Sequence, residues 1–218
     1  MVLQSEIVAL QDRMTELWHE APDALDCHVL ASTAVEACGG KNAQEDWLAL
    51  VARQHRANFD LWHVEDEARA PETTDADLAE VKRRIDATNQ IRNDLMEELD
   101  RMLLSRLEGR GLPNALAPLH SETPGMIIDR LSILALKIYH TREEAGRNDG
   151  PAGHSARNRQ RLAILEVQRR DLAACLSALW AEVEEGTRRF KLYRQLKMYN
   201  DPSLNPAVYG KSAAPEGR

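Results

Sequence analysis

Ionisable and apolar side chains alternate closely between residues 61 and 69 of this chain. Within that segment, His63, Asp66 and Arg69 follow one another at three-residue intervals, so in a helix they project from neighbouring surfaces. Imidazole and carboxylate groups arranged in this way can bind a divalent metal or exchange a proton with a substrate. The predicted catalytic residues are His63, Glu65 and Asp66, and the predicted substrate-binding residues beside them are Trp62 and Arg69.

The same spacing also fits an ordinary helix surface. In that interpretation His63 packs against Trp62, while Glu65, Asp66 and Arg69 form surface ion pairs. Each such pair contributes less than about 1 kcal/mol to stability. The spacing alone leaves both interpretations open.

A column of polar residues recurs at three- and four-residue steps further along the chain, namely Asp86, Asn89, Asn93, Glu97 and Asp100. The column could face solvent. However, each asparagine inside a helix costs roughly 0.5 kcal/mol relative to alanine, which favours a buried polar network.

Arg92 lies nearer the apolar side, where a charge must be paired or contact an anion. The predicted substrate-binding residues here are Asn89, Arg92 and Asn93, and the predicted metal ligands are Asp66, Glu97 and Asp100.

Two later segments add charged and aromatic candidates. The segment after Glu122 and the basic, aromatic segment near residue 197 supply further predicted substrate-binding residues, namely Asp129, Arg130, Lys137, His140, Lys197 and Tyr199. Cationic and aromatic side chains suit a phosphate group or a stacked ring. They equally suit an amphipathic helix whose charges pair with each other, or a helix docked on the core.

These candidates must be positioned by helices, because apolar residues recur at three- and four-residue steps throughout the chain. The expected helices span residues 5–20, 43–70, 75–109, 124–145 and 155–185, and a shorter one carries Phe190, Tyr193, Leu196 and Tyr199. Prolines and capping residues mark several of the ends. We predict an all-α single-domain bundle of about five to six helices over residues 1–210, several of them long, followed by a disordered tail at 211–218.

Composition excludes some classes of function. The 218 residues are 43% hydrophobic, enough to bury one core, and the formal net charge is −7. That charge argues against nucleic-acid binding, which needs a clustered basic surface.

The three cysteines, Cys27, Cys38 and Cys175, lack metal-ligand spacing and are typical of reduced thiols in a cytoplasm. No apolar stretch is long enough for a membrane span, so we expect a soluble cytoplasmic protein.

Several ungapped motifs occur in order along the chain: Asn58-Phe59-x-Leu61-Trp62-His63-x-Glu65-Asp66-x-Ala68-Arg69, Ile85-Asp86-x-x-Asn89-x-x-Arg92-Asn93-Asp94, Glu122-Thr123-Pro124-Gly125, Asp129-Arg130-Leu131-Ser132-Ile133 and Lys197-Met198-Tyr199-Asn200-Asp201-Pro202. Together they resemble a bacterial family of helical proteins labelled only as a domain of unknown function. The resemblance spans Asn58 to Pro206. It implies an all-helical fold and a shared polar constellation, and it implies no substrate.

A more distant analogy is to the all-helical nucleoside triphosphate pyrophosphohydrolases, which hold Mg²⁺ between an E-x-x-E helix and an E-x-x-D helix. The run Glu97-Glu98-Leu99-Asp100 fits the second pattern. The preceding helix offers His63-x-x-Asp66 in place of the first pattern, so the metal ligands do not carry over directly.

The leading hypothesis is a metal-assisted hydrolase acting on a phosphorylated small molecule, such as a nucleotide or nucleotide sugar, with Mg²⁺ or another divalent metal. The alternative is a non-catalytic binding or scaffold protein whose polar core fixes the helix register. A carboxylate-bridged di-iron protein ranks last, because the paired E-x-x-H motifs of that class are absent. We also consider a homodimer, because long amphipathic helices often retain apolar surface after intramolecular packing.

Overall fold

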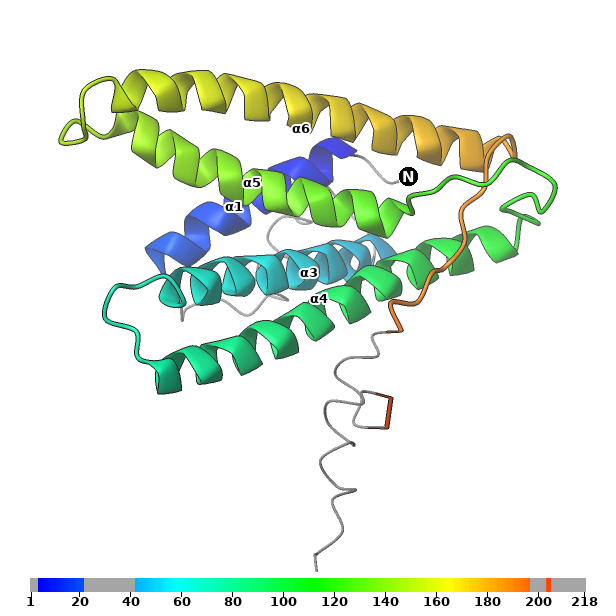
Figure 1. The fold of residues 1–218 in the computed structure, drawn as a ribbon. Helices are drawn as coiled ribbons and strands as arrows, with labels where there is room; N and C mark the ends of the chain where they lie inside the picture. Colours follow the sequence, from blue (N-terminus) through cyan, green and yellow to red (C-terminus); the bar gives the residue numbers. More distant parts are fainter. Residues whose placement is uncertain (1–3, 22–41, 197–202, 205–218) are drawn as a thin grey trace, which may run out of the picture.

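Five helices make up the described part of the computed structural model, which covers residues 4–21, 42–196 and 203–204 (Figure 1). They are α1 (Gln4–Glu20), α3 (Asn42–Glu67), α4 (Asp75–Glu108), α5 (Pro124–Gly146) and α6 (His154–Glu184). In these residues an isolated bridge between Leu119 and Arg189 is the only strand-like pairing. The predicted all-α class is therefore confirmed, and the five long helices fall close to their expected ranges.

Side chains that cap helix ends explain two of the boundaries. Thr74 accepts a hydrogen bond from the backbone of Asp77, whose side chain in turn accepts one from the Thr74 backbone, and this capping box begins α4. Thr123 caps α5 by accepting a hydrogen bond from the Met126 backbone at 3.2 Å, with Pro124 in the first turn. Both ends are encoded locally in the sequence.

Helix α5 lies at the centre of the bundle and contacts each of the other four described helices. Figure 1 shows α5 running alongside α6 on one side of the molecule, with α3 and α4 side by side on the other and α1 behind α5. The core between the helices is apolar and closely packed. Its largest fully buried side chains include Trp18, Trp47, Leu99, Leu103, Ile128 and Leu131. This arrangement brings α1, α3 and α4 against different faces of one helix.

The expected short C-terminal helix is absent from residues 188–196, which form no regular structure apart from the bridge at Arg189. Phe190 is buried in the core, whereas Tyr193 and Leu196 are 42% and 81% exposed. Backbone groups of Arg189 pair with Pro118 and His120 in the loop before α5. The three-residue spacing of large side chains was misleading, because pairing with that loop replaces the hydrogen bonds of a helix. Tyr199 and the predicted tail at 211–218 lie outside the described residues.

Helices α4 and α5 approach closely where α5 begins. The backbone N–H of Gly125 donates a 2.7 Å hydrogen bond to the carboxyl group of Asp100 on α4. A side chain at position 125 would meet the Met96 carbonyl oxygen, because an added Cβ would lie 2.5 Å from it. Glycine is therefore required for this contact between the two helices.

Among the described residues, none of the helices combines the length and the hydropathy that crossing a lipid bilayer requires.

Candidate functional site

A pocket of about 370 Å³ lies between α3, α4 and α5. Its lining consists of Asn58, Leu61, Trp62, Glu65, Asp66, Arg69, Arg92, Ile133 and Leu136. Five of these residues, Trp62, Glu65, Asp66, Arg69 and Arg92, were predicted from the sequence to belong to a site. A volume near 300 Å³ or above is enough for a small ligand. The fold thus brings predicted residues from two helices to one concave surface.

Arg92 and Asp129 form a bidentate ion pair across α4 and α5. The Arg92 Nε and Nη2 atoms donate to the two Asp129 carboxylate oxygens at 2.7 and 2.5 Å. The Asp129 side chain is only 7% exposed and that of Arg92 is 24% exposed. These hydrogen bonds raise the pKa of the Arg92 guanidinium above its usual value. These bonds use the Nε and Nη2 atoms of a side chain that also lines the pocket.

Asp129 also anchors a buried network that continues into α3. Its Oδ1 atom accepts hydrogen bonds from Gln54 Nε2 at 2.7 Å and Asn58 Nδ2 at 3.0 Å. Asn58 Nδ2 additionally donates to Ser132 Oγ at 2.9 Å. Because Asn58 also lines the pocket, the network fixes the position of one residue of the pocket lining.

His55 extends this network from Ser132 to α1. Ser132 Oγ lies 2.7 Å from His55 Nδ1, and His55 Nε2 lies 2.9 Å from Thr15 Oγ. Thr15 donates its own hydroxyl proton to the Gln11 carbonyl oxygen, so it accepts from His55, which must carry its proton on Nε2. Burial lowers the pKa of His55 to about 3, and the ring is therefore neutral, as this chain of hydrogen bonds requires.

The sequence prediction missed Gln54, His55 and Ser132 as members of the site. All three are completely buried in the structure. The sequence feature that could have identified them is a polar residue at a helical position that faces the core. Burial of so many polar groups requires partners from other helices. Which partners these are depends on the packing of α1, α3 and α5, and the sequence does not show that packing directly.

Two carboxylates at the pocket are held by Arg69. Arg69 Nη2 lies 2.9 Å from Glu65 Oε2, and Arg69 Nη1 lies 4.0 Å from Asp66 Oδ1. The Glu65 side chain is 39% exposed, while those of Asp66 and Arg69 are 64% and 66% exposed. The contacts are thus surface ion pairs, and all three residues line the pocket.

The three predicted metal ligands do not meet in the structure. Glu97 accepts a hydrogen bond from the Gln195 backbone at 2.9 Å, and Asp100 is turned toward the start of α5. In the described part of the chain, the only group of three metal-ligating side chains close together is His19, His63 and His140. Asp66, Glu97 and Asp100 therefore form no shared site, because the helical column that carries the last two faces the C-terminal segment and α5.

Asp100 has a structural role that its pH response should reveal. Burial raises the pKa of its carboxyl group from 3.8 to about 6, against the opposing effect of hydrogen bonds from Thr123 and Gly125. As pH rises from 4 toward 6, the unfolded chain releases this proton before the folded chain does. The carboxyl group therefore reduces stability over that range.

We expect Asp100→Asn to remove this part of the pH dependence. Between pH 4 and pH 7, the free energy of unfolding of the wild type should decrease by on the order of 2–3 kcal/mol more than that of Asp100→Asn. Urea denaturation of both proteins across this pH range measures the difference. Parallel stability profiles for the two proteins would contradict the assignment.

The remaining predicted residues are distributed over other surfaces. Asn89 lines a neighbouring pocket, which shares Glu65 with the first. Arg130 forms an ion pair with Glu122 at 2.6 Å and, with Lys137, lines a cavity of about 660 Å³ between α5 and α6. Asn93 is partly exposed on α4. Lys197 and Tyr199 lie outside the described residues.

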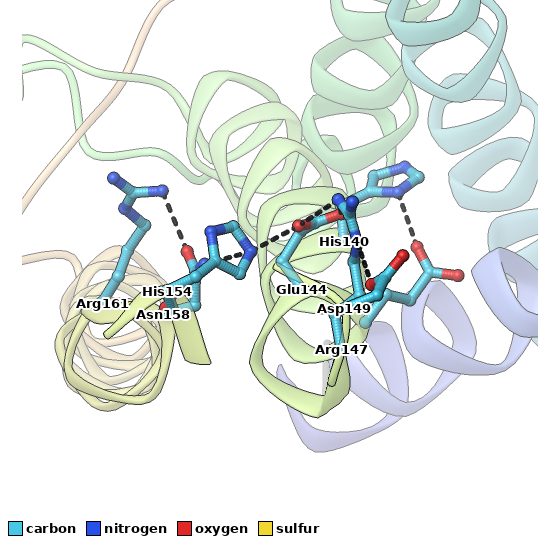
Figure 2. A network of polar contacts seen from close by, with 8 residues as sticks. His140, Glu144, Arg147, Asp149, His154, Asn158 and Arg161 are labelled. Carbon is cyan, nitrogen blue, oxygen red and sulfur yellow. Dashed lines mark hydrogen bonds and ion pairs between the residues drawn. The ribbon is translucent and has the colours of Figure 1, made fainter. Parts of the chain in front are cut away.

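His140 lies between a polar network that joins α5 to α6 and the histidines His19 and His63. Figure 2 shows a network that links α5 to α6 through Glu144, His154 and Asn158, with the His140 ring pointing away from it. His154 Nε2 lies 2.6 Å from Glu144 Oε2, and this hydrogen bond holds the pKa of Glu144 below its usual value. Burial lowers the pKa of His140 itself. The ring contacts His19 and His63 on α1 and α3. Neither His63 nor His140 lines the pocket between α3, α4 and α5, although His140 stacks on Trp62, which does.

Comparison with known proteins gives a family and no activity. No curated protein and no solved structure matches the chain. One family model, described as "Protein of unknown function (DUF4254)", matches residues 48–192, about two thirds of the chain. The match includes the pocket residues of α3, α4 and α5 and leaves out α1. The resemblance to a helical family of unknown function is confirmed over residues 48–192, and the chain belongs to the DUF4254 family.

Proposed function

We propose that this protein is a metal-assisted hydrolase of a phosphorylated small molecule, such as a nucleotide or nucleotide sugar. The observation that carries the proposal is the convergence of two carboxylates, two guanidinium groups and an indole ring on one pocket of about 370 Å³. Carboxylates and cations placed together suit a substrate that brings both phosphate charge and a divalent cation.

The cations of the pocket would bind the phosphate. Arg92 is held in place by Asp129 and lines the pocket, so its guanidinium group would contact a phosphate oxygen there. Arg69 is exposed and exchanges its carboxylate contacts for phosphate contacts. Trp62 offers an apolar ring for the base or sugar.

The carboxylates would serve the reaction itself. Mg²⁺ in proteins is commonly bound by one or two carboxylates together with substrate phosphates, and Glu65 and Asp66 supply this ligand type. A bound Mg²⁺ would offset charge on the phosphate. One of the two carboxylates would accept a proton from the attacking water, whose oxygen forms the new bond to phosphorus as the leaving group departs with the electron pair of the broken bond.

Amide substitutions test these roles without changing side-chain size. We expect Glu65→Gln and Asp66→Asn each to lower hydrolysis at least 100-fold, because a general base and a metal ligand contribute at this level. The assay measures phosphate and nucleotide release, with Mg²⁺, from nucleoside di- and triphosphates and nucleotide sugars.

Glu72→Gln is the matched control, since Glu72 is an exposed acid in the turn between α3 and α4, outside the pocket lining. Its activity should equal that of the wild type. Undiminished hydrolysis by both pocket variants, or the absence of hydrolysis of every compound by the wild type, would contradict the proposed function.

A second candidate is a non-catalytic binding or scaffold protein. The observation that favours it is that Asp129 is satisfied internally, by Gln54, Asn58 and Arg92. A network of this kind can fix the register of packed helices without any ligand. This candidate predicts that neither Mg²⁺ nor nucleotides bind.

A further inference from the structure

Three histidine rings from three different helices meet on the side of α3 that faces α1 and α5. One ring nitrogen from each of His19, His63 and His140 lies within 4.8 Å of the others. The centroid of the His19 ring lies 5.2 Å from that of the His63 ring and 5.0 Å from that of the His140 ring. The residues are far apart in sequence, so the cluster is a product of the tertiary fold.

Each ring has a fixed tautomer, because each Nδ1 atom lies against an oxygen that can only accept. The partners are the Thr15 carbonyl oxygen at 2.7 Å for His19, the Phe59 carbonyl oxygen at 2.8 Å for His63, and Glu143 Oε2 at 3.0 Å for His140. Each Nδ1 therefore carries a hydrogen, and in the neutral ring each Nε2 carries a lone pair. Metal-ligating histidines in proteins are oriented in this way by carbonyl and carboxylate oxygens.

Two of the three Nε2 atoms have no hydrogen-bond partner. Those of His19 and His140 are completely buried and make no hydrogen bond. Two neutral Nε2 lone pairs cannot bond to each other, since both are acceptors. A buried polar atom without a partner costs about 1–3 kcal/mol, and a cation between the rings would satisfy these acceptors at once.

Aromatic residues hold the rings from outside. His19 stacks on Tyr139 with centroids 4.2 Å apart, and His140 stacks on Trp62 with centroids 4.9 Å apart. The His63 ring contacts Phe59 at 4.3 Å. Such walls limit ring rotation and restrict water, and both effects favour metal binding.

We propose that His19, His63 and His140 bind a transition-metal ion, with Zn²⁺ the best match. Imidazole nitrogens suit Zn²⁺, whereas Mg²⁺ prefers oxygen ligands, so this site is separate from the carboxylates of the proposed active pocket. Three histidines leave a fourth position of tetrahedral Zn²⁺ open. Zn–N bonds of about 2.1 Å place two ligand nitrogens about 3.4 Å apart, so the ring nitrogens, which lie within 4.8 Å of one another, would move closer together on binding.

Metal titration of the untagged, chelator-treated chain tests the site without reference to hydrolysis. We expect one Zn²⁺ per chain by calorimetry, and one Co²⁺ that gives the visible absorption of a tetrahedral nitrogen-ligated ion. His63→Gln and His140→Gln should each weaken Zn²⁺ binding at least 100-fold. Excess Mg²⁺ should not compete.

His120→Gln is the matched control, because His120 lies in the loop before α5, outside the cluster. It should bind Zn²⁺ as the wild type does. Zn²⁺ should also raise the melting temperature of the wild type and of His120→Gln, and leave that of His63→Gln unchanged. The proposal is overturned if the wild type binds no Zn²⁺, or if folded His63→Gln and His140→Gln both bind it with wild-type affinity. The phosphate pocket can pass or fail its own tests in either case.

Discussion

Replacing Asp129 by alanine should lower the free energy of unfolding by about 3–5 kcal/mol. The change removes the acceptor shared by Gln54, Asn58 and Arg92. Arg92, whose side chain is only 24% exposed, would be left as a largely buried charge without its counter-ion. Breaking such a pair is costly because the desolvation penalty remains while the attraction is lost. Urea denaturation at pH 7 measures the effect.

The neighbouring residue provides the control for this loss. Arg130 is on the same helix, but its side chain is 54% exposed and its ion pair with Glu122 is at the surface. Arg130→Ala should therefore cost less than about 1 kcal/mol. A similarly small cost for Asp129→Ala would show that the buried network does not hold α3, α4 and α5 together.

Substituting Gly125 with alanine should destabilise the protein by about 2–4 kcal/mol. The new Cβ would lie 2.5 Å from the Met96 carbonyl oxygen and 2.9 Å from Asp100 Oδ1. The carbonyl oxygen belongs to the backbone of α4, so the clash is relieved only if the two helices separate. Separation in turn weakens the hydrogen bond from Gly125 to Asp100. Chemical denaturation of the variant measures the combined cost.

Gly146 is the matched control, because it is the last residue of the same helix and an added Cβ there meets nothing within 4 Å. Gly146→Ala should leave stability unchanged or raise it slightly, since alanine has the higher helix propensity. Equal stability of the two variants would contradict the close approach of α4 and α5 at position 125.

The helices were predictable because their signals are local. Thr74 and Thr123 cap the helices that follow them, as their positions before apolar-periodic segments indicated. The C-terminal segment was not predictable by the same means. Phe190 enters the core while the backbone of Arg189 pairs with residues about 70 positions earlier in the chain. No short-range pattern reports such a pairing.

The sequence named several residues that the structure brings to one pocket, but not the contacts that they make. Trp62, Glu65 and Asp66 are among these residues, and they line the pocket together. The requirement that Arg92 be paired or meet an anion anticipated a partner, and the structure identifies it as Asp129. Asp100 was assigned to a metal because its spacing resembles a ligand motif, whereas it contacts the first turn of α5. His19 carried no local signal, since a histidine cluster exists only after three helices have packed.

The most direct measurement is a calorimetric titration of a methylene-bridged ADP analogue, which resists hydrolysis at the bridge, into protein with Mg²⁺. If the pocket between α3, α4 and α5 binds phosphorylated molecules, the wild type should bind one analogue per chain and Arg69→Ala should bind it at least tenfold more weakly. Arg83→Ala should retain wild-type affinity, because Arg83 is an exposed α4 residue that pairs with Glu80 outside the pocket lining. Two results would contradict phosphate binding in this pocket. One is that neither this analogue nor a nucleotide sugar gives any binding heat, and the other is that wild type and Arg69→Ala bind with equal affinity.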